Sequence, residues 1–377
     1  MSRLRFYRHA PTGGSVVADG VVDPLLLGQR VVAILETGLR TATYKLATLM
    51  ALIDHCVENL PEQLDDDLAV PIPDLARRVL EVYWRQVVPF DGHELRQSTQ
   101  PRARILIAAN NLRNAAGTQS QSLAIEIAAI RAPDTYQRAI DEITLCLAQQ
   151  PLHRLQRLPG SDASDCFLYD DSFLHDHVSR STLRAHNDSI VLNPGVAHGL
   201  ARLAGLLKPA LEIMWVDDVR RMNKFLLADR FPDVAGHLFG RERVMLNAVR
   251  EPLKEAFGPH CFYCNTHLPA GNPIDHVLPW SLVGIDGLAN LVLACARCNS
   301  DKSGALPAIA IVDRVLERDQ ETLEDIAATI QWPTQHQRVV AAARGIYRGQ
   351  PAGLPTWSGY GDTVRLDVSF PPAWLST

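Results

Sequence analysis

Two Cys-x-x-Cys pairs, Cys261/Cys264 and Cys295/Cys298, place the strongest constraint on how this chain folds. Four thiolates from two such pairs suit a tetrahedral zinc ion and leave it no open coordination position, as is typical of a structural zinc site. Residues 265–294, between the pairs, form a longer insertion than a zinc ribbon usually has. We therefore expect structural Zn²⁺ at the four cysteines and a small folded unit between the pairs.

The composition is that of an ordinary globular protein rather than of a polycation. The 377 residues include 37 Lys and Arg against 42 Asp and Glu, which gives a net charge of −5. Contact with nucleic acid would therefore depend on local basic patches. The other cysteines, Cys56, Cys146 and Cys166, follow no pattern, which favours reduced thiols over a disulfide framework.

Neither a targeting segment nor a membrane segment is expected. The first residues lack the apolar core of a signal peptide. The long apolar run at residues 200–215 is interrupted by charged residues and by Pro209, so it is unsuited to crossing a bilayer. We therefore expect a cytoplasmic protein without membrane contact.

The pattern of apolar residues divides the chain into four expected regions. Apolar residues recur at helical spacing through most of residues 1–150, which predicts a helical domain. Residues 151–240 combine short strand-like runs with helices and carry basic clusters suited to DNA contact. Residues 241–306 enclose the cysteine pairs, and residues 307–377 are expected to form C-terminal helices and a short edge strand. The predicted fold class is mainly α, with a small embedded zinc domain and minor β structure.

Polar residues between the cysteine pairs are suited to hydrolysing a phosphodiester. Asp275 and His276 lie in the extended run IDHVLPW, and Asn290 precedes the apolar run LVLAC. The second cysteine pair opens a helix that holds Asn299, so a β-hairpin followed by a helix is expected. Carboxylate and amide oxygens are ligands for a hard divalent ion such as Mg²⁺. A neutral imidazole beside such an ion can accept a proton from water.

DHVLPW and ANLVLACARCNSDKS, flanked by the two cysteine pairs, resemble the HNH endonucleases of the zinc-containing ββα-metal type. The resemblance covers residues 258–305 and implies cleavage or nicking of DNA with one divalent cation, Mg²⁺ or Mn²⁺. It implies that His276 is the general base, that Asp275 binds the metal and that Asn290 orients the hairpin. Asn299 stands where the family has its final His or Asn metal ligand. A role in restriction or anti-phage defence, with protein partners of a defence system, is an expectation for the class.

Several of these residues also have a purely structural interpretation. Asn290 is suited to starting a strand after a turn, and Asn299 is suited to capping a helix N-terminus. Lys302 shares a helix face with Asn299, so it is either a phosphate contact or a solvated charge at the helix end. Acidic neighbours of the upstream arginines also fit a solvated helix face. The other candidate contacts to DNA are Arg297, Arg241 and Arg250.

Two hypotheses follow from these observations. In the first, the chain is a metal-dependent endonuclease or nickase that acts on double-stranded DNA. In the second, the cysteine clamp is a non-catalytic zinc module that recognises nucleic acid or protein. The intact set of Asp275, His276, Asn290 and Asn299 favours the enzyme, because a purely structural module needs no general base. A single site cuts one strand and predicts nicking, whereas a double-strand break would need a dimer or two successive events.

Overall fold

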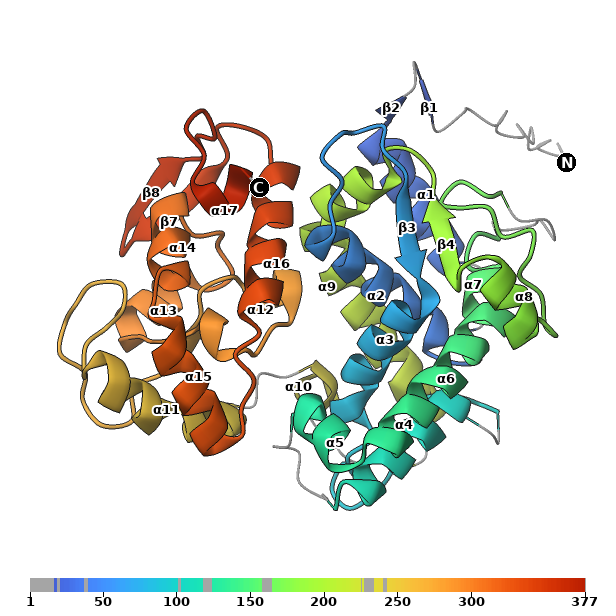
Figure 1. Cartoon of the computed structure of the whole chain (residues 1–377), viewed down its shortest axis with the longest axis horizontal. Helices are drawn as coiled ribbons and strands as arrows, with labels where there is room; N and C mark the ends of the chain where they lie inside the picture. The colour runs from blue at the N-terminus through green and yellow to red at the C-terminus, as the bar shows by residue number, and fades with distance from the viewer. Residues whose placement is uncertain are drawn as a thin grey trace, which may run out of the picture.

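The structure is a computed structural model that describes residues 17–18, 21–36, 40–100, 103–117, 124–157, 165–224, 226, 234–239 and 243–376. Figure 1 shows two lobes built mostly from helices, one from the N-terminal elements and one from the C-terminal elements. Strands in the described residues pair as small two-stranded antiparallel sheets. The predicted fold class, mainly α with minor β structure, is confirmed.

The N-terminal lobe is built around two central helices, α2 (Tyr44–Glu58) and α9 (Val196–Met222). Buried residues occur on all sides of α2, as expected for a helix inside a core. The helices that complete this lobe are α1 (Pro24–Glu36), α3 (Ile72–Gln86), α4 (Arg104–Ala115), α5 (Ile125–Arg131), α6 (Pro133–Gln149), α7 (Pro151–Arg154), α8 (Arg180–Ala185) and α10 (Val234–Phe239). No helix in the described part of the chain is long and apolar enough to cross a membrane.

The N-terminal lobe joins residues on both sides of the boundary expected at residue 150. Strand β3 (Leu68–Pro71) pairs antiparallel with β4 (Ser189–Leu192), so residues far apart in the chain share one sheet. One hydrophobic core runs from α1 and α2 through to α9. The described parts of residues 24–222 therefore pack as one body. A short hairpin of β1 (Val17–Ala18) and β2 (Val21–Val22) precedes it.

The C-terminal lobe contains the expected β-hairpin and helix. Strand β5 (Ile274–His276) pairs antiparallel with β6 (Leu291–Leu293), and α13 (Ala296–Lys302) follows. Helix α12 (Trp280–Val283) and the 3₁₀ turn η1 (Leu288–Asn290) lie between the two strands. The remaining elements are α11 (Arg243–Phe257), α14 (Ile309–Leu316), α15 (Gln320–Ile330), α16 (His336–Gly349), β7 (Pro355–Gly359), β8 (Asp362–Arg365) and α17 (Ala373–Ser376).

A second hydrophobic core surrounds the cysteines and draws on chain segments beyond them. It includes Val249 and Leu253 of α11 and Leu323 of α15. Trp357 of β7 also packs in this core, and its indole Nε1 donates a hydrogen bond to Asp301 at 2.7 Å. The residues after 306 therefore complete the lobe that holds the ββα unit.

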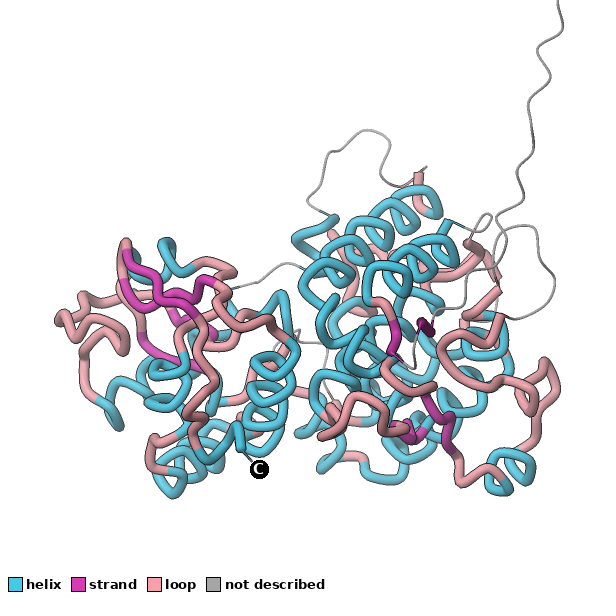
Figure 2. Tube along the Cα trace, turned by 90° about the horizontal axis from the view of Figure 1, so that it is seen from above, coloured by secondary structure: helices cyan, strands magenta, loops and turns pink. Residues whose placement is uncertain are grey.

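Helix α16 fastens the C-terminal lobe to the N-terminal lobe, and Figure 2 shows the two lobes side by side. A Cβ atom on Gly345 would lie 1.7 Å from the carbonyl oxygen of Val57, so α16 and α2 touch backbone to backbone. Arg338 of α16 pairs with Glu58 at 3.0 Å, and Lys208 of α9 donates to the carbonyl oxygen of Leu282 at 3.0 Å. The site-bearing hairpin is thereby held against the helical body.

Substituting Gly345 by Ala is expected to destabilise the protein because the new methyl group has no room beside Val57. Overpacking of this kind costs roughly 1–3 kcal/mol, and more where backbone must move. Urea denaturation of Gly345→Ala and of Gly359→Ala measures the effect. A Cβ on Gly359 meets no atom within 4 Å, so that variant serves as the control. Equal midpoints for both variants would contradict the close helix contact.

Candidate active site and metal centre

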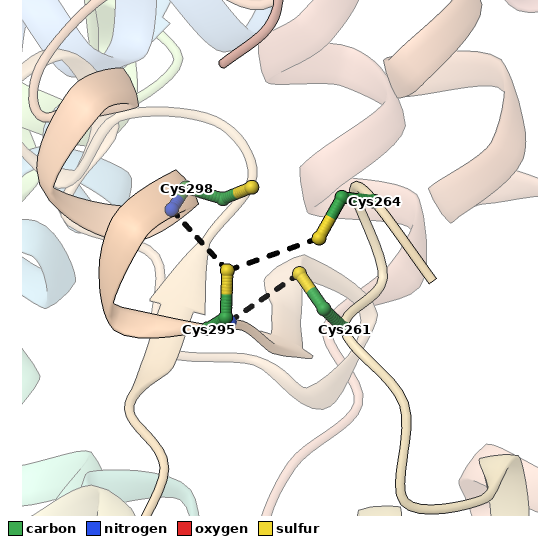
Figure 3. A group of neighbouring side chains, drawn as sticks. All are labelled: Cys261, Cys264, Cys295 and Cys298. Atoms are coloured by element: carbon green, nitrogen blue, oxygen red, sulfur yellow. Dashed lines mark hydrogen bonds between the residues drawn. The ribbon is translucent and has the colours of Figure 1, made fainter. Parts of the chain in front are cut away.

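The four cysteines of the two pairs converge on one point of the C-terminal lobe, as Figure 3 shows. Their sulfur atoms all lie within 4.8 Å of one another. Cys261 and Cys264 lie in the loop after α11, while Cys295 and Cys298 lie at the start of α13. Four converging sulfurs are the ligand set of a closed zinc site, so this cluster can hold zinc, as predicted.

Backbone N–H groups support negative charge on the cysteine sulfurs. The backbone N–H of Cys298 donates to the sulfur of Cys295 at 3.4 Å, and that of Cys295 donates to the sulfur of Cys261 at 3.3 Å. Although burial opposes ionisation, the hydroxyl of Thr266 and other hydrogen bonds lower the pKa of Cys264 to about 6. Burial raises the pKa of Cys261 and Cys298. Zinc binding would therefore release protons, because zinc takes thiolates.

Asp275 and His276 are adjacent in β5 and make separate sets of contacts. Asp275 pairs with Val292 of β6 and His276 with Leu291, and successive side chains of a strand point to opposite faces. The Asp275 carboxylate accepts a hydrogen bond from the Tyr263 hydroxyl at 2.5 Å. The His276 ring instead contacts Asp286, at 2.7 Å. The two side chains thus contact different neighbours.

The Asp286 carboxylate fixes which nitrogen of His276 carries a proton. Burial alone would raise the pKa of Asp286, but Arg85 and His276 together hold that pKa well below its usual range. An ionised carboxylate only accepts hydrogen bonds, so the His276 Nε2 must donate to it. In the neutral ring this leaves the lone pair on Nδ1, which has no hydrogen-bond partner among the described residues. His276 is therefore arranged as a proton acceptor at Nδ1.

Arg85 brings the helical lobe into this site. It lies in the last turn of α3, 201 residues before Asp286 in the chain, and its guanidinium forms an ion pair with the Asp286 carboxylate. Trp332 also donates its indole N–H to the backbone carbonyl of Asp286, at 2.7 Å. A Cβ on Gly287 would lie 2.4 Å from the carbonyl oxygen of Thr334, so the loop carrying Asp286 is tightly seated.

Asp275 and Asn299 offer the donor atoms that a hard divalent ion prefers. Both contacts of Asp275 in the described residues involve Oδ2: Tyr263 donates a hydrogen bond to it, and the Lys302 ammonium lies 3.1 Å away. The other carboxylate oxygen, Oδ1, is left as a ligand atom for a metal ion. The half-buried Asn299 side chain makes no hydrogen bond within the described residues, and it shares a face of α13 with Lys302. One carboxylate and one amide oxygen fit a magnesium-type ion that retains several water ligands.

Lys302 lies inside the site rather than on its surface. Its side chain is fully buried, and its ammonium group donates to the carbonyl oxygen of His276 at 2.7 Å. The prediction of a phosphate contact by Lys302 does not agree with this burial. The ammonium instead joins Asp275 and the backbone of His276, so it ties α13 to β5.

Asn290 is fully buried and hydrogen bonds to the loop that follows β5. Its Oδ1 accepts from the backbone N–H of Leu278 at 2.8 Å. Its Nδ2 donates to the carbonyl oxygens of Leu278 at 3.2 Å and Ile285 at 3.1 Å. These contacts close the loop between the strands and restrain the segment just after His276.

The arginines expected to contact DNA have different environments. Arg297 is exposed on α13, and its guanidinium carbon lies 3.5 Å from the centre of the Tyr360 ring. Arg250 is half-buried and donates to the carbonyl oxygen of Asn272 at 2.8 Å, which supports the loop before β5. Arg241 lies outside the described residues. Among these, Arg297 keeps the exposure that a phosphate contact requires.

Two families match this chain. The family described as a domain of unknown function (DUF8808) matches residues 27–228, more than half of the 377 residues. The chain belongs to that family. The HNH endonuclease family matches residues 261–304, so the ββα unit with its cysteine pairs is an HNH domain, as the sequence resemblance predicted. No curated protein and no solved structure matches the chain.

The sequence reasoning missed Asp286 and Arg85. The sequence marks Asp286 only weakly as a site residue, as an acidic residue between Ile285 and Gly287 in the loop of the HNH domain. Arg85 had none, because it lies in the DUF8808 region and meets the HNH domain only through the packing of the two lobes. Tyr263 was also missed, since an aromatic residue between two cysteines is ordinarily a packing residue.

Purified protein is expected to contain one zinc ion per chain, and Cys298→Ser is expected to lose most of it. Removing one of four ligands opens the site, and acidification should release zinc because protons compete for the thiolates. Elemental analysis by mass spectrometry measures the stoichiometry. Cys146→Ala is the control because Cys146 is a buried thiol of the DUF8808 region, outside the cluster. Equal zinc content in all three proteins would contradict this site.

Proposed function

We propose that this protein is a metal-dependent endonuclease that hydrolyses phosphodiester bonds of DNA. The observation that carries the proposal is the His276–Asp286 contact of 2.7 Å, which leaves Nδ1 of His276 as the acceptor for a proton. A histidine held in one tautomer by an ionised carboxylate is suited to general-base work. The match of residues 261–304 to HNH endonucleases supports the same chemistry.

The residues of the site have separate tasks in this mechanism. His276 takes a proton from water at Nδ1, Asp286 stabilises the resulting imidazolium, and Asn290 keeps the loop beyond β5 in place. Asp275 and Asn299 would hold one Mg²⁺ or Mn²⁺, which supplies charge stabilisation at the scissile phosphate when bound. The four cysteines would hold a structural Zn²⁺, apart from the chemistry.

We take double-stranded DNA as the substrate and a nick as the primary product. In this proposal the single matched HNH domain supplies one base and one metal site, so each binding event would cut one strand. Arg297 lies on the exposed side of α13 and is the phosphate contact that we favour. The net charge of −5 means that affinity would depend on such local contacts and would fall with salt.

A role in restriction or anti-phage defence in the cytoplasm is the broader proposal. It is supported by the HNH domain joined to a second large domain within one chain. In such a system the DUF8808 region would supply recognition or control, and protein partners would act through it. The rigid seat of the HNH domain on this region, through α16 and Arg85, fits a controlled nuclease.

His276→Ala is expected to abolish relaxation of supercoiled plasmid in Mg²⁺ or Mn²⁺, because loss of a general base costs about 10²–10⁴-fold in rate. His177→Ala is the control, since His177 is an exposed histidine of the DUF8808 region. Both proteins should be assayed at matched zinc content. Wild type and the control should nick the plasmid with equal rates.

Three results would count against this function. Cleavage by His276→Ala at the wild-type rate would exclude His276 as the base. Cleavage that persists in a chelator of divalent ions at intact zinc content would exclude the metal-dependent mechanism. If wild-type protein is inert on plasmid and phage DNA yet binds both, the non-catalytic zinc module becomes the better interpretation.

A further inference from the structure

A cavity of about 150 Å³ lies between the two lobes, next to the residues that hold His276. Its lining comes from α2, α3, α9, α10 and residues 124–126 on one side and from α12, Gly284, Asp286 and residues 332–338 on the other. Arg85 and Asp286 keep 34% and 20% of their side-chain surface exposed, so solvent reaches the cavity at this end. A cavity of this size holds a small ring system and is too small for a dinucleotide cofactor.

Gln86, in the lining of this cavity, is 2% exposed, and neither Nε2 nor Oε1 of its side chain has a hydrogen-bond partner among the residues that the structure describes. Leaving buried polar atoms unpaired costs roughly 1–3 kcal/mol per group. Both amide atoms are enclosed, so the side chain would turn toward the cavity to offer a ligand one donor and one acceptor. Arg78, also in the lining, has a buried Nε with no hydrogen-bond partner in the described part of the chain.

The walls of the cavity favour a flat ligand without negative charge. The indoles of Trp280 and Trp332 contribute to the lining and suit the faces of a planar ring, while Trp84, also in the lining, has the Arg113 guanidinium over its own ring. Each Lys or Arg of the lining already has an acidic partner: Arg78 with Glu58, Arg85 with Asp286, Lys208 with Asp54 and Arg338 with Glu81. A phosphate would therefore find its counter-charges already engaged.

We propose that this cavity binds a neutral nucleobase, with the Gln86 amide reading its hydrogen-bonding edge. A glutamine amide pairs in two places with the N6 and N7 atoms of adenine, so adenine is the expected base. The base comes either from a nucleotide extruded from bound DNA or from a free nucleoside. An occupant would touch Arg85 and Asp286, so it would also bear on the orientation of His276; this last step rests on the proposed nuclease function.

The binding test uses the full-length zinc-loaded protein and follows tryptophan fluorescence. Adenosine is expected to quench the emission with saturation, and guanosine, cytidine and thymidine are expected to bind more weakly. Gln86→Leu should weaken adenosine binding by at least tenfold. That variant should fold at least as stably as wild type, because it removes an unsatisfied buried amide. Gln137→Leu is the control, since Gln137 is an exposed glutamine of α6.

A second arm distinguishes the two sources of the base. Extrusion of an adenine leaves its thymine unpaired, so permanganate reactivity of thymines in duplex DNA should rise with wild-type protein and not with Gln86→Leu. Saturable adenosine binding without this rise identifies a free nucleoside as the ligand. Absence of both signals, or equal signals from wild type and Gln86→Leu, would overturn the proposal. Neither readout requires cleavage, so an inert nuclease would leave this test intact.

Discussion

The Asp286 carboxylate is the contact on which the arrangement of the site depends. It accepts a hydrogen bond from His276 at 2.7 Å within the HNH domain and forms an ion pair with Arg85 of the DUF8808 region. Burial raises the pKa of this carboxylate, and Arg85 acts with His276 to lower it, so the guanidinium helps to keep Asp286 in the ionised form that requires Nε2 of His276 to be the donor. The helical lobe therefore takes part in setting the protonation of the HNH histidine.

The contact between the lobes fixes the position of α16 on α2 more than it adds to the stability of the folded protein. Largely buried ion pairs such as Arg338–Glu58, which joins α16 to α2, lose hydration on folding, and this loss offsets much of the attraction between their charges. They do exclude other positions of α16 on α2, because a shifted helix would leave charges buried without partners. Gly345 adds a steric condition, since only a residue without a side chain lets the two backbones touch. The pair Arg85–Asp286 is aligned as a consequence.

Local sequence patterns were enough to predict the cysteine cluster and the ββα unit, because both depend on residues close together in the chain. The burial of Lys302 could not be predicted, since it depends on Asp275 and the His276 carbonyl coming together across the hairpin–helix gap. The pairing of β3 with β4, which joins regions expected to be separate, also arises from distant segments. Arg85 was the hardest residue to predict, because nothing near it in the sequence indicates that it contacts a residue of the HNH domain.

The most direct test is the ¹⁵N NMR spectrum of the His276 ring, in protein labelled at histidine and assigned with a His276→Gln variant. At a pH where the ring is neutral, Nε2 should carry the proton and Nδ1 should be bare, because Asp286 requires a donor at Nε2. Arg85→Met should weaken this preference and give a mixture of tautomers. A wild-type ring protonated at Nδ1 would contradict the role assigned to Asp286 and Arg85, and with it the assignment of Nδ1 as the proton acceptor.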